Sequence, residues 1–284
     1  ELGLTCETPF FIDLAPTRDV TLTPLVTPSA GVLLSGRYRE LQDFGLTEIA
    51  GAITYTDAAG KRDENDDLKP RGQEVRGNID ASGRYVLSEN DRAGFDVRLT
   101  TDDTFLQRYG ISNANVLENN AYLERFGDRD YLALNAYGFQ SLRENDDQDE
   151  IPFVLPLAEA NLYGGRDRFG GFTELKTSAL GLTRDDGLDT RRFSTELGWQ
   201  RPHIGTIGDV WTLRLALRGD VYTTDGNPQT RGPEGGTNTA GRVVPTASVG
   251  WGLPVVGETG RWSHVIEPRV AASYAPNDLN DSDI

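Results

Sequence analysis

The stretch WTLRLALRGDVYT, Trp211–Thr223, alternates strictly between two kinds of side chain. The two sets, each in chain order, are Trp211, Leu213, Leu215, Leu217, Gly219 and Val221, and Thr212, Arg214, Ala216, Arg218 and Asp220. Successive side chains of a β-strand point to opposite faces, so a period of two predicts a strand with one apolar and one charged face.

The same alternation recurs at 78–87, 93–100, 192–199 and 262–274. These segments run about eight to thirteen residues, whereas strands of soluble proteins most often have about five or six. Tilted strands that cross a bilayer need roughly nine to eleven residues. Aromatic residues near the ends of the apolar faces match the girdles at membrane interfaces, although aromatics are common in any sheet. Strand length therefore favours membrane-spanning strands over a soluble sandwich.

Taken in order, the chain predicts about fourteen antiparallel strands joined by turns rich in Gly, Asp, Asn and Pro. The predicted fold is all-β, a partial antiparallel transmembrane β-barrel of about fourteen strands that belong to a larger barrel. No helix-period segment stands out, and two long loops are expected at Lys61–Glu74 and Thr224–Gly241. The predicted strands are 2–14, 19–27, 32–41, 46–57, 75–87, 92–102, 115–127, 129–142, 153–164, 171–183, 190–201, 210–223, 242–254 and 261–275.

Composition limits the classes of partner. A net charge of -16 over 284 residues argues against nucleic acid, whose phosphates need Lys and Arg. There is no apolar run long enough for a transmembrane helix. The chain has no Met, which leads us to expect a processed or excised piece of a longer protein. Two acidic runs are expected to be solvated loops, with a divalent-cation site as the alternative; they are Asp63, Glu64, Asp66 and Asp67, and Glu144, Asp146, Asp147, Asp149 and Glu150.

The sequence offers little for catalysis. His203 and His264 are far apart and form no metal-spaced pair, and no nucleophile-elbow or phosphate-loop motif is present. Asp102 and Asp103 stand together at a strand end, where a solvated turn is the expected role. We therefore predict no enzyme and no catalytic, cofactor or metal residues, with a hydrolase at the mouth of the barrel as a minor alternative.

Cys6 is the single cysteine, so it forms no disulfide within this chain. A buried apolar thiol is the expected state, and a partner cysteine in another segment is the alternative.

The first stretch, TPFFIDLAPTRDVTLTPLV (Thr8–Val26), reads as two extended segments joined by a turn, with Pro9 in the first and Pro24 in the second. Proline has no N–H for a β-ladder and occurs at sheet edges, strand starts or weak seams. We predict that this hairpin is one side of a seam in a large barrel. A sheet in lipid cannot leave an open edge, so either the predicted strands close on themselves or further strands follow.

The segment PFFIDLAPTRDVTLTP, Pro9–Pro24, resembles the start of the barrel in the LptD family of outer-membrane lipopolysaccharide-assembly proteins. The shared features are a proline followed by aromatic residues, an Ala-Pro turn, an Asp and a Thr-x-Thr-Pro segment. The segments RYREL at 37–41, SENDRAGFDVRLTTDDTFLQRYG at 88–110 and HVIEPRVAASYAP at 264–276 are also similar to that family.

This resemblance implies a barrel of about twenty-six strands with a lateral gate between its first and last strands. Residues 1–284 would be an incomplete outer-membrane barrel domain, without the periplasmic N-terminal domain and the later strands. The gate residues implied are Pro9, Phe10, Phe11, Ile12 and Pro24. No family disulfide is carried over to Cys6.

The function implied is transport of lipopolysaccharide through the barrel lumen and its insertion, through the gate, into the outer leaflet of the Gram-negative outer membrane. Implied partners are lipopolysaccharide, the plug lipoprotein LptE, a periplasmic bridge that docks on the absent N-terminal domain, and outer-membrane lipid. A general porin or solute channel is the alternative function, and a soluble β-rich binding protein is the third.

Overall fold

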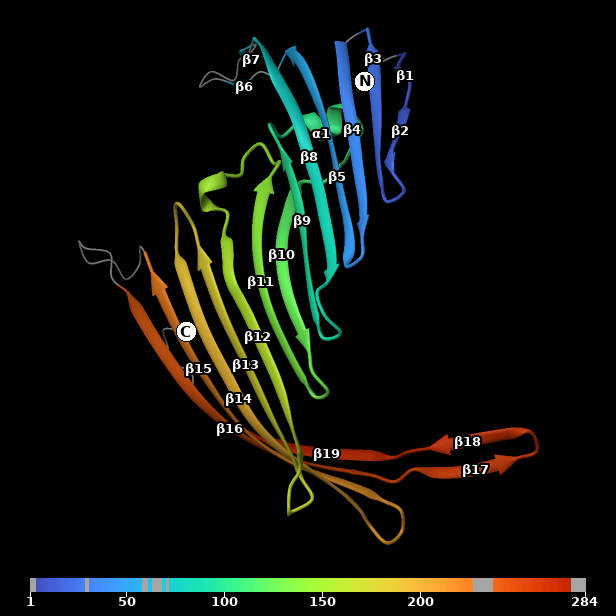
Figure 1. The fold of residues 1–284 in the computed structure, drawn as a ribbon. Coiled ribbons are helices and arrows are strands. Elements are labelled where there is room, and N and C mark those ends of the chain that lie inside the picture. The colour runs from blue at the N-terminus through green and yellow to red at the C-terminus, as the bar shows by residue number, and fades with distance from the viewer. Residues whose placement is uncertain are drawn as a thin grey trace. The chain divides into compact units, whose positions relative to one another are not determined.

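The computed structural model describes residues 4–28, 31–57, 61–62, 68–69, 72–226 and 237–276. Among them, regular structure is almost entirely β, with one 15-stranded sheet and two two-stranded sheets (Figure 1). Consecutive strands of the large sheet are antiparallel wherever their register is defined, which confirms the predicted fold class. No helix in the described residues is both long and apolar enough to cross a membrane.

The strands of the large sheet follow the order β1-β3-β4-β5-β8-β9-β10-β11-β12-β13-β14-β15-β16-β19, and β2 also pairs with β3. Their bounds are β1 Cys6–Glu7, β2 Phe10–Ala15, β3 Arg18–Thr27, β4 Gly31–Gln42, β5 Gly45–Asp57, β8 Gln73–Val86, β9 Asp91–Thr100, β10 Val116–Phe126, β11 Asp130–Ser141, β12 Phe153–Arg166, β13 Phe172–Thr183, β14 Asp189–Ile204, β15 Val210–Asp225, β16 Asn238–Gly252 and β19 Arg269–Tyr274. The smaller elements are β6 Lys61–Arg62, β7 Leu68–Lys69, β17 Val255–Thr259, β18 Trp262–Ile266, helix α1 Phe105–Arg108 and the 3-10 turn η1 Gln148–Glu150.

The chain divides into two compact units, which are described separately. Unit 1 consists of 1–124, 135–155 and 184–187, and unit 2 of 125–134, 156–183 and 188–284. Unit 1 holds the ladders from β1 to β9 and the helix α1, and unit 2 holds the ladders from β13 to β19.

Most strand positions agree with the predicted ones, but β17 (Val255–Thr259) lies between two predicted strands and was not predicted, and other places also differ. The predicted strand 2–14 is split into β1 and β2 by Thr8 and Pro9, and the predicted strand 261–275 is split into β18 and β19 by Glu267 and Pro268. Both breaks contain a proline, which cannot donate to a ladder. The predicted loop Lys61–Glu74 contains the short β6–β7 pair, and the helix α1 was not predicted.

The two acidic runs fare differently. Asp63, Glu64, Asp66 and Asp67 lie outside the described residues, as does 227–236 of the second predicted long loop. The run that includes Asp146 and Asp149 is exposed, as expected for a solvated loop. Asp147 accepts a hydrogen bond from the Asp149 N–H, which begins η1.

The sheet has an inverted distribution of polarity. On β15, Leu213, Leu215 and Leu217 are 41–49% exposed, whereas Asp220 on the opposite face is only 1% exposed. Among the described residues, the largest fully buried side chains are Arg76, Phe105 and Asp220, of which two are charged. Soluble monomers rarely expose apolar areas of this extent. Such a sheet suits strands whose apolar side chains face lipid.

Strand register keeps the two faces separate across the sheet. On the face opposite the exposed apolar residues, Arg84 of β8 pairs with Asp96 of β9 at 2.6 Å, and Arg98 of β9 lies 3.3 Å from Asp80 of β8. We call this charged side the polar face and the other side the apolar face. Cross-strand ion pairs of this kind stabilise one register over its neighbours.

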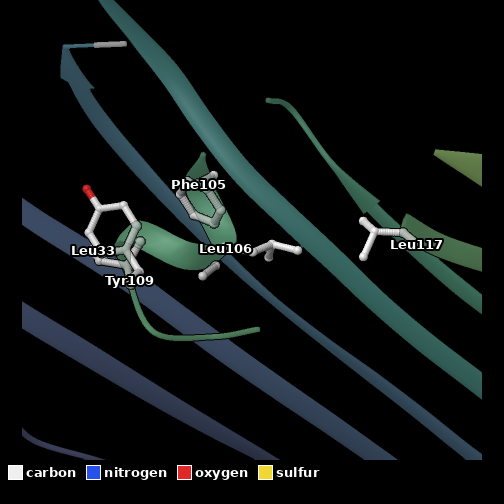
Figure 2. Close-up of a cluster of buried hydrophobic side chains, with 6 residues drawn as sticks. Leu33, Phe105, Leu106, Tyr109 and Leu117 are labelled. Carbon is white, nitrogen blue, oxygen red and sulfur yellow. The ribbon is translucent and has the colours of Figure 1, made fainter. Parts of the chain in front are cut away.

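A small hydrophobic core interrupts the polar face of unit 1 (Figure 2). Phe105 and Leu106 of α1 are buried against Leu33 of β4, together with Tyr109 and Leu117. Gly110, with a φ of 66°, ends the helix because this left-handed conformation favours glycine. The helix is therefore held by a local apolar patch on an otherwise polar surface.

An ion pair fixes the start of α1. Arg76 of β8 is fully buried. Its Nε donates to Asp102 Oδ2 at 2.8 Å, and its Nη2 donates to Thr104 Oγ1 at 2.8 Å. Its guanidinium also lies 5.8 Å from the centre of the Phe105 ring. Asp102 is thus not the solvated turn residue that we predicted, although Asp103 beside it is exposed.

We expect Asp102→Asn to lower the free energy of unfolding by about 3 kcal/mol, because it removes the carboxylate charge that pairs with the buried Arg76 cation. Asp103→Asn is the matched control, and its effect should stay within about 0.5 kcal/mol because Asp103 is exposed. Urea unfolding of the purified protein in detergent measures both. Equal effects of the two substitutions would contradict the anchoring role.

The same pair predicts a pH dependence. Burial raises the pKa of Asp102, but hydrogen bonds from Arg76 and Thr104 outweigh burial and lower it from 3.8 to about 2. Because the folded pKa lies below the unfolded one, this stabilisation is present above about pH 5 and is lost as the pH falls through 2. The stability difference between wild type and Asp102→Asn should therefore shrink by about 2 kcal/mol between pH 5 and pH 2. A difference that stays constant would argue against the pairing.

Candidate functional site

The N-terminal edge of the sheet is built from two short strands on one long strand. Both β1 and β2 pair with β3, through Cys6↔Val26 and Glu7↔Leu25 for β1 and from Phe10↔Leu22 onward for β2. Among the described residues, no strand pairs with the other side of β1 or β2. These strands therefore present backbone donors and acceptors at an open edge.

The ladder between the edge and β3 is interrupted where the two prolines meet. Thr8 donates its backbone N–H to the carbonyl of Pro24 at 3.2 Å. In an antiparallel ladder this pair would exchange two hydrogen bonds, but Pro24 has no N–H to return. The pair keeps one bond of two.

Pro9 weakens the opposite side of the same strand. Backbone groups of an antiparallel strand alternate in direction, and Thr8 points toward β3. The neighbouring residue Pro9 therefore points toward the open edge, where it lacks a donor. Pro9 and Pro24 thus remove donors on both sides of the first strand at one level.

The loss of backbone hydrogen bonds does not extend into the ladder between β3 and β4. Pro24 lies opposite Leu34 of β4, within a ladder that runs without a break from Arg18↔Glu40 to Thr27↔Gly31. The nitrogen of Pro24 faces the edge strand, so the β3–β4 ladder loses nothing. At this edge of the described sheet, Pro24 therefore weakens the attachment of the edge strand to β3 and not that of β3 to β4.

The remaining predicted gate residues lie on β2. Phe10, Phe11 and Ile12 are 56%, 64% and 43% exposed and lie opposite Leu22, Thr21 and Val20. The β2–β3 ladder is irregular again between Asp13 and Ala15. All five predicted residues therefore come together on the edge hairpin, and their role as a gate stays a prediction.

Several other predicted positions can be placed. Cys6 is exposed, not buried as predicted, because β1 is an edge strand with a neighbour on one side only. His203 and His264 are exposed in β14 and β18. Among the described residues no group of three or more metal-ligating side chains is present.

Tryptophans and acidic turn residues form fixed turns in unit 2. Trp199 donates to Asp167 Oδ2 at 2.7 Å, and Trp211 and Trp251 donate to Asp209 Oδ2 at 2.7 and 3.1 Å. These hydrogen bonds lower the pKa of both carboxyl groups. Trp199 and Trp211, which we predicted to be part of an aromatic girdle, thus also hold these turns in a fixed conformation.

Sequence reasoning did not single out the charged cluster around Asp220 on β14–β16. The signal lies in Arg192, Arg218 and Arg242, which occupy polar-face positions of three consecutive strands. Finding it requires the register between strands, which alternation within one strand does not provide.

Comparison with known proteins adds independent evidence. The family described as LPS transport system D (LptD) matches residues 74–284. The chain is 23% identical to the LPS-assembly protein LptD of Xanthomonas euvesicatoria pv. vesicatoria, over 94% of this chain and 36% of that protein. It is 27% identical to the proteins of the same name from Chromohalobacter salexigens, over 96% of this chain and 37% of that protein, and from Paracidovorax citrulli, over 96% and 34%.

The chain spans about a third of the length of these curated relatives. The family match covers most of the chain and agrees with the all-β sheet and its inverted polarity. This chain belongs to the LPS transport system D (LptD) family of the Gram-negative outer membrane.

Proposed function

We propose that this chain is part of an outer-membrane β-barrel that carries lipopolysaccharide through its lumen and releases it sideways into the outer leaflet. The polar face lines the lumen and the apolar face meets lipid. The edge hairpin of β1, β2 and β3 forms one side of the lateral gate. Family membership and the inverted polarity of the sheet support this assignment.

The interruption at Thr8, Pro9 and Pro24 is the observation that carries the proposal. Each backbone hydrogen bond contributes about 1 kcal/mol net in water, and an unmade bond costs several kcal/mol in lipid. A first strand that lacks donors on both sides at one level is easier to separate than any strand with complete ladders. The unbroken β3–β4 ladder confines that separation to the edge.

The chemistry of lipopolysaccharide requires such an edge. Its sugars need a wet, polar path, whereas its acyl chains need lipid. A barrel with a polar lumen and a separable seam lets the sugars travel inside while the acyl chains leave sideways. The exposed Phe10 and Ile12 give these chains an apolar surface at the opening, whereas Phe11, opposite Thr21, lies on the polar face of the same strand.

The other partners follow from the family resemblance. We propose that residues 1–284 form part of a single barrel domain, with a periplasmic domain and further strands outside this sequence. That domain would receive lipopolysaccharide from a periplasmic bridge, and the lipoprotein LptE would occupy the lumen. The chemistry is transport without catalysis.

A photocrosslinking amino acid at Phe11 tests the gate in living cells. We expect crosslinks to lipopolysaccharide that require energised transport, because Phe11 lies at the open edge. Leu197 on the apolar face of β14 is the control position, since it is similarly exposed but lies far from the edge in the strand order. Absence of crosslinks at Phe11 in a correctly assembled barrel would favour a general porin.

Restoring a backbone donor should tighten the edge. Pro24→Ala returns an N–H opposite Thr8, and one added hydrogen bond of about 1 kcal/mol corresponds to about a fivefold lower population of the open edge. We expect a matching loss of crosslinking at Phe11 and greater sensitivity of the cells to large antibiotics.

Pro245→Ala is the control for this substitution, because Pro245 lies inside β16, opposite Leu217 of β15. It should leave both readouts unchanged. If Pro24→Ala also changes neither, the prolines do not set the strength of the edge.

A further inference from the structure

Three arginines surround one buried carboxylate on the polar face of unit 2. Asp220 of β15 accepts hydrogen bonds from Arg242 Nε at 2.8 Å, from Arg218 Nε at 3.1 Å and from the hydroxyl of Ser194. Arg192 completes the cluster with its Nη2 3.7 Å from Asp220, an ion pair longer than a hydrogen bond. The carboxylate is fully buried, whereas the three arginine side chains are 24–39% exposed.

This arrangement leaves positive charge at the surface. One carboxylate offsets one of three guanidinium groups. Arg192 and Arg242 also lie over the ring of Tyr222, with their Cζ atoms 5.3 and 5.9 Å from its centre. Stacking and the shared carboxylate hold the guanidinium planes in fixed orientations.

Adjacent acidic residues do not cancel this excess. Glu196 and Glu174 are bound by Arg214, at 2.9 Å for Glu196, and Lys176 lies 3.3 Å from Glu174. That group of four is neutral. Even with Glu159 of β12 included, the described residues of this region comprise five cationic and four anionic side chains, in a chain whose net charge is -16.

A cavity of about 260 Å³ opens beside the cluster, and Arg218 belongs to both. Its other polar contributors include Asn161, Ser178, Ser194 and Glu159. Hydroxyl, amide and carboxylate groups are the hydrogen-bonding partners that sugar hydroxyls need. The volume falls just below the range of about 300–1,000 Å³ typical of small-molecule sites, which suits one sugar ring.

We infer that this cavity binds a sugar unit that carries an anionic group. The ring occupies the cavity between β12 and β15, and the phosphate or carboxylate of the sugar lies against Arg218 and the adjoining arginines. Guanidinium groups bind both kinds of anion through charge-assisted hydrogen bonds. This inference rests on the proposed function, because the sugar would belong to lipopolysaccharide in transit along the polar face.

The test uses the purified full-length protein in detergent and a soluble probe. The probe is the deacylated, phosphorylated oligosaccharide of lipopolysaccharide, titrated by calorimetry. Arg218→Gln should weaken binding at least about tenfold, since it removes a charge-assisted contact. Arg191→Gln is the matched control, because Arg191 is exposed on the opposite face of β14, and it should leave the affinity within about twofold.

A second variant keeps the inference testable if Arg218→Gln fails to fold. Ser178→Leu fills the cavity and leaves the ligands of Asp220 in place, so it should also weaken binding about tenfold. Ala179→Leu places the same bulk at the next residue of β13, on the apolar face, and should bind as the wild type does.

Two chemically altered probes identify the anion. The reference is the weakened affinity of the intact probe for Arg218→Gln. If dephosphorylated oligosaccharide binds the wild type equally weakly, the arginines bind the phosphate of the sugar. If carboxyl-reduced oligosaccharide does so, they bind its carboxylate. Equal binding of all three probes to wild type, Arg218→Gln and Ser178→Leu would overturn the inference. If the sugar site fails this test but Phe11 still crosslinks to lipopolysaccharide, the proposed function stands without the sugar site. If the crosslinks at Phe11 are absent as well, both the sugar site and the proposed function are wrong.

Discussion

Backbone hydrogen bonding between strands is the constraint on which this structure depends. In lipid a strand cannot turn to water for missing partners, so every N–H and C=O must be paired within the sheet. The β14–β15 register runs without a shift from Asp189↔Asp225 to Ile204↔Val210. At the edge, Pro9 between β1 and β2 and Pro24 of β3 each lack a donor, and this deficit is permanent because no rearrangement can give proline an N–H.

Once the strands are paired, side chains have only two faces to occupy. The apolar face takes Leu, Val, Phe and Trp, and the polar face must accommodate Arg, Asp and Glu close together. Charges on adjacent strands therefore bind each other, as Arg84 does with Asp96 and Arg242 does with Asp220. The helix α1 packs on this polar face through a small apolar patch around Leu33, and the buried Arg76–Asp102 pair fixes its start.

Alternation within single strands was sufficient to predict the fold class, nearly all strands and both faces, because period two is a local property of the chain. The elements that sequence reasoning missed depend on contacts between distant segments. The helix α1 has four residues, too few for a helical period, and it is held by Arg76 from another strand. The exposure of Cys6 and the cluster around Asp220 likewise depend on which strands are neighbours and in what register. The edge prolines were predictable because the missing N–H is a property of the residue itself.

The position of the two prolines matters more than their number. Had both faced the same side, the first strand would remain firmly bound on the other. Because Pro24 faces the edge strand and Pro9 faces away from β3, backbone donors are missing on both sides of that strand at one level. The next ladder, β3–β4, is complete, so a disturbance at the edge has no easy route into the sheet. This arrangement permits local separation of one strand while the polar face behind it, with its cross-strand ion pairs, stays in register.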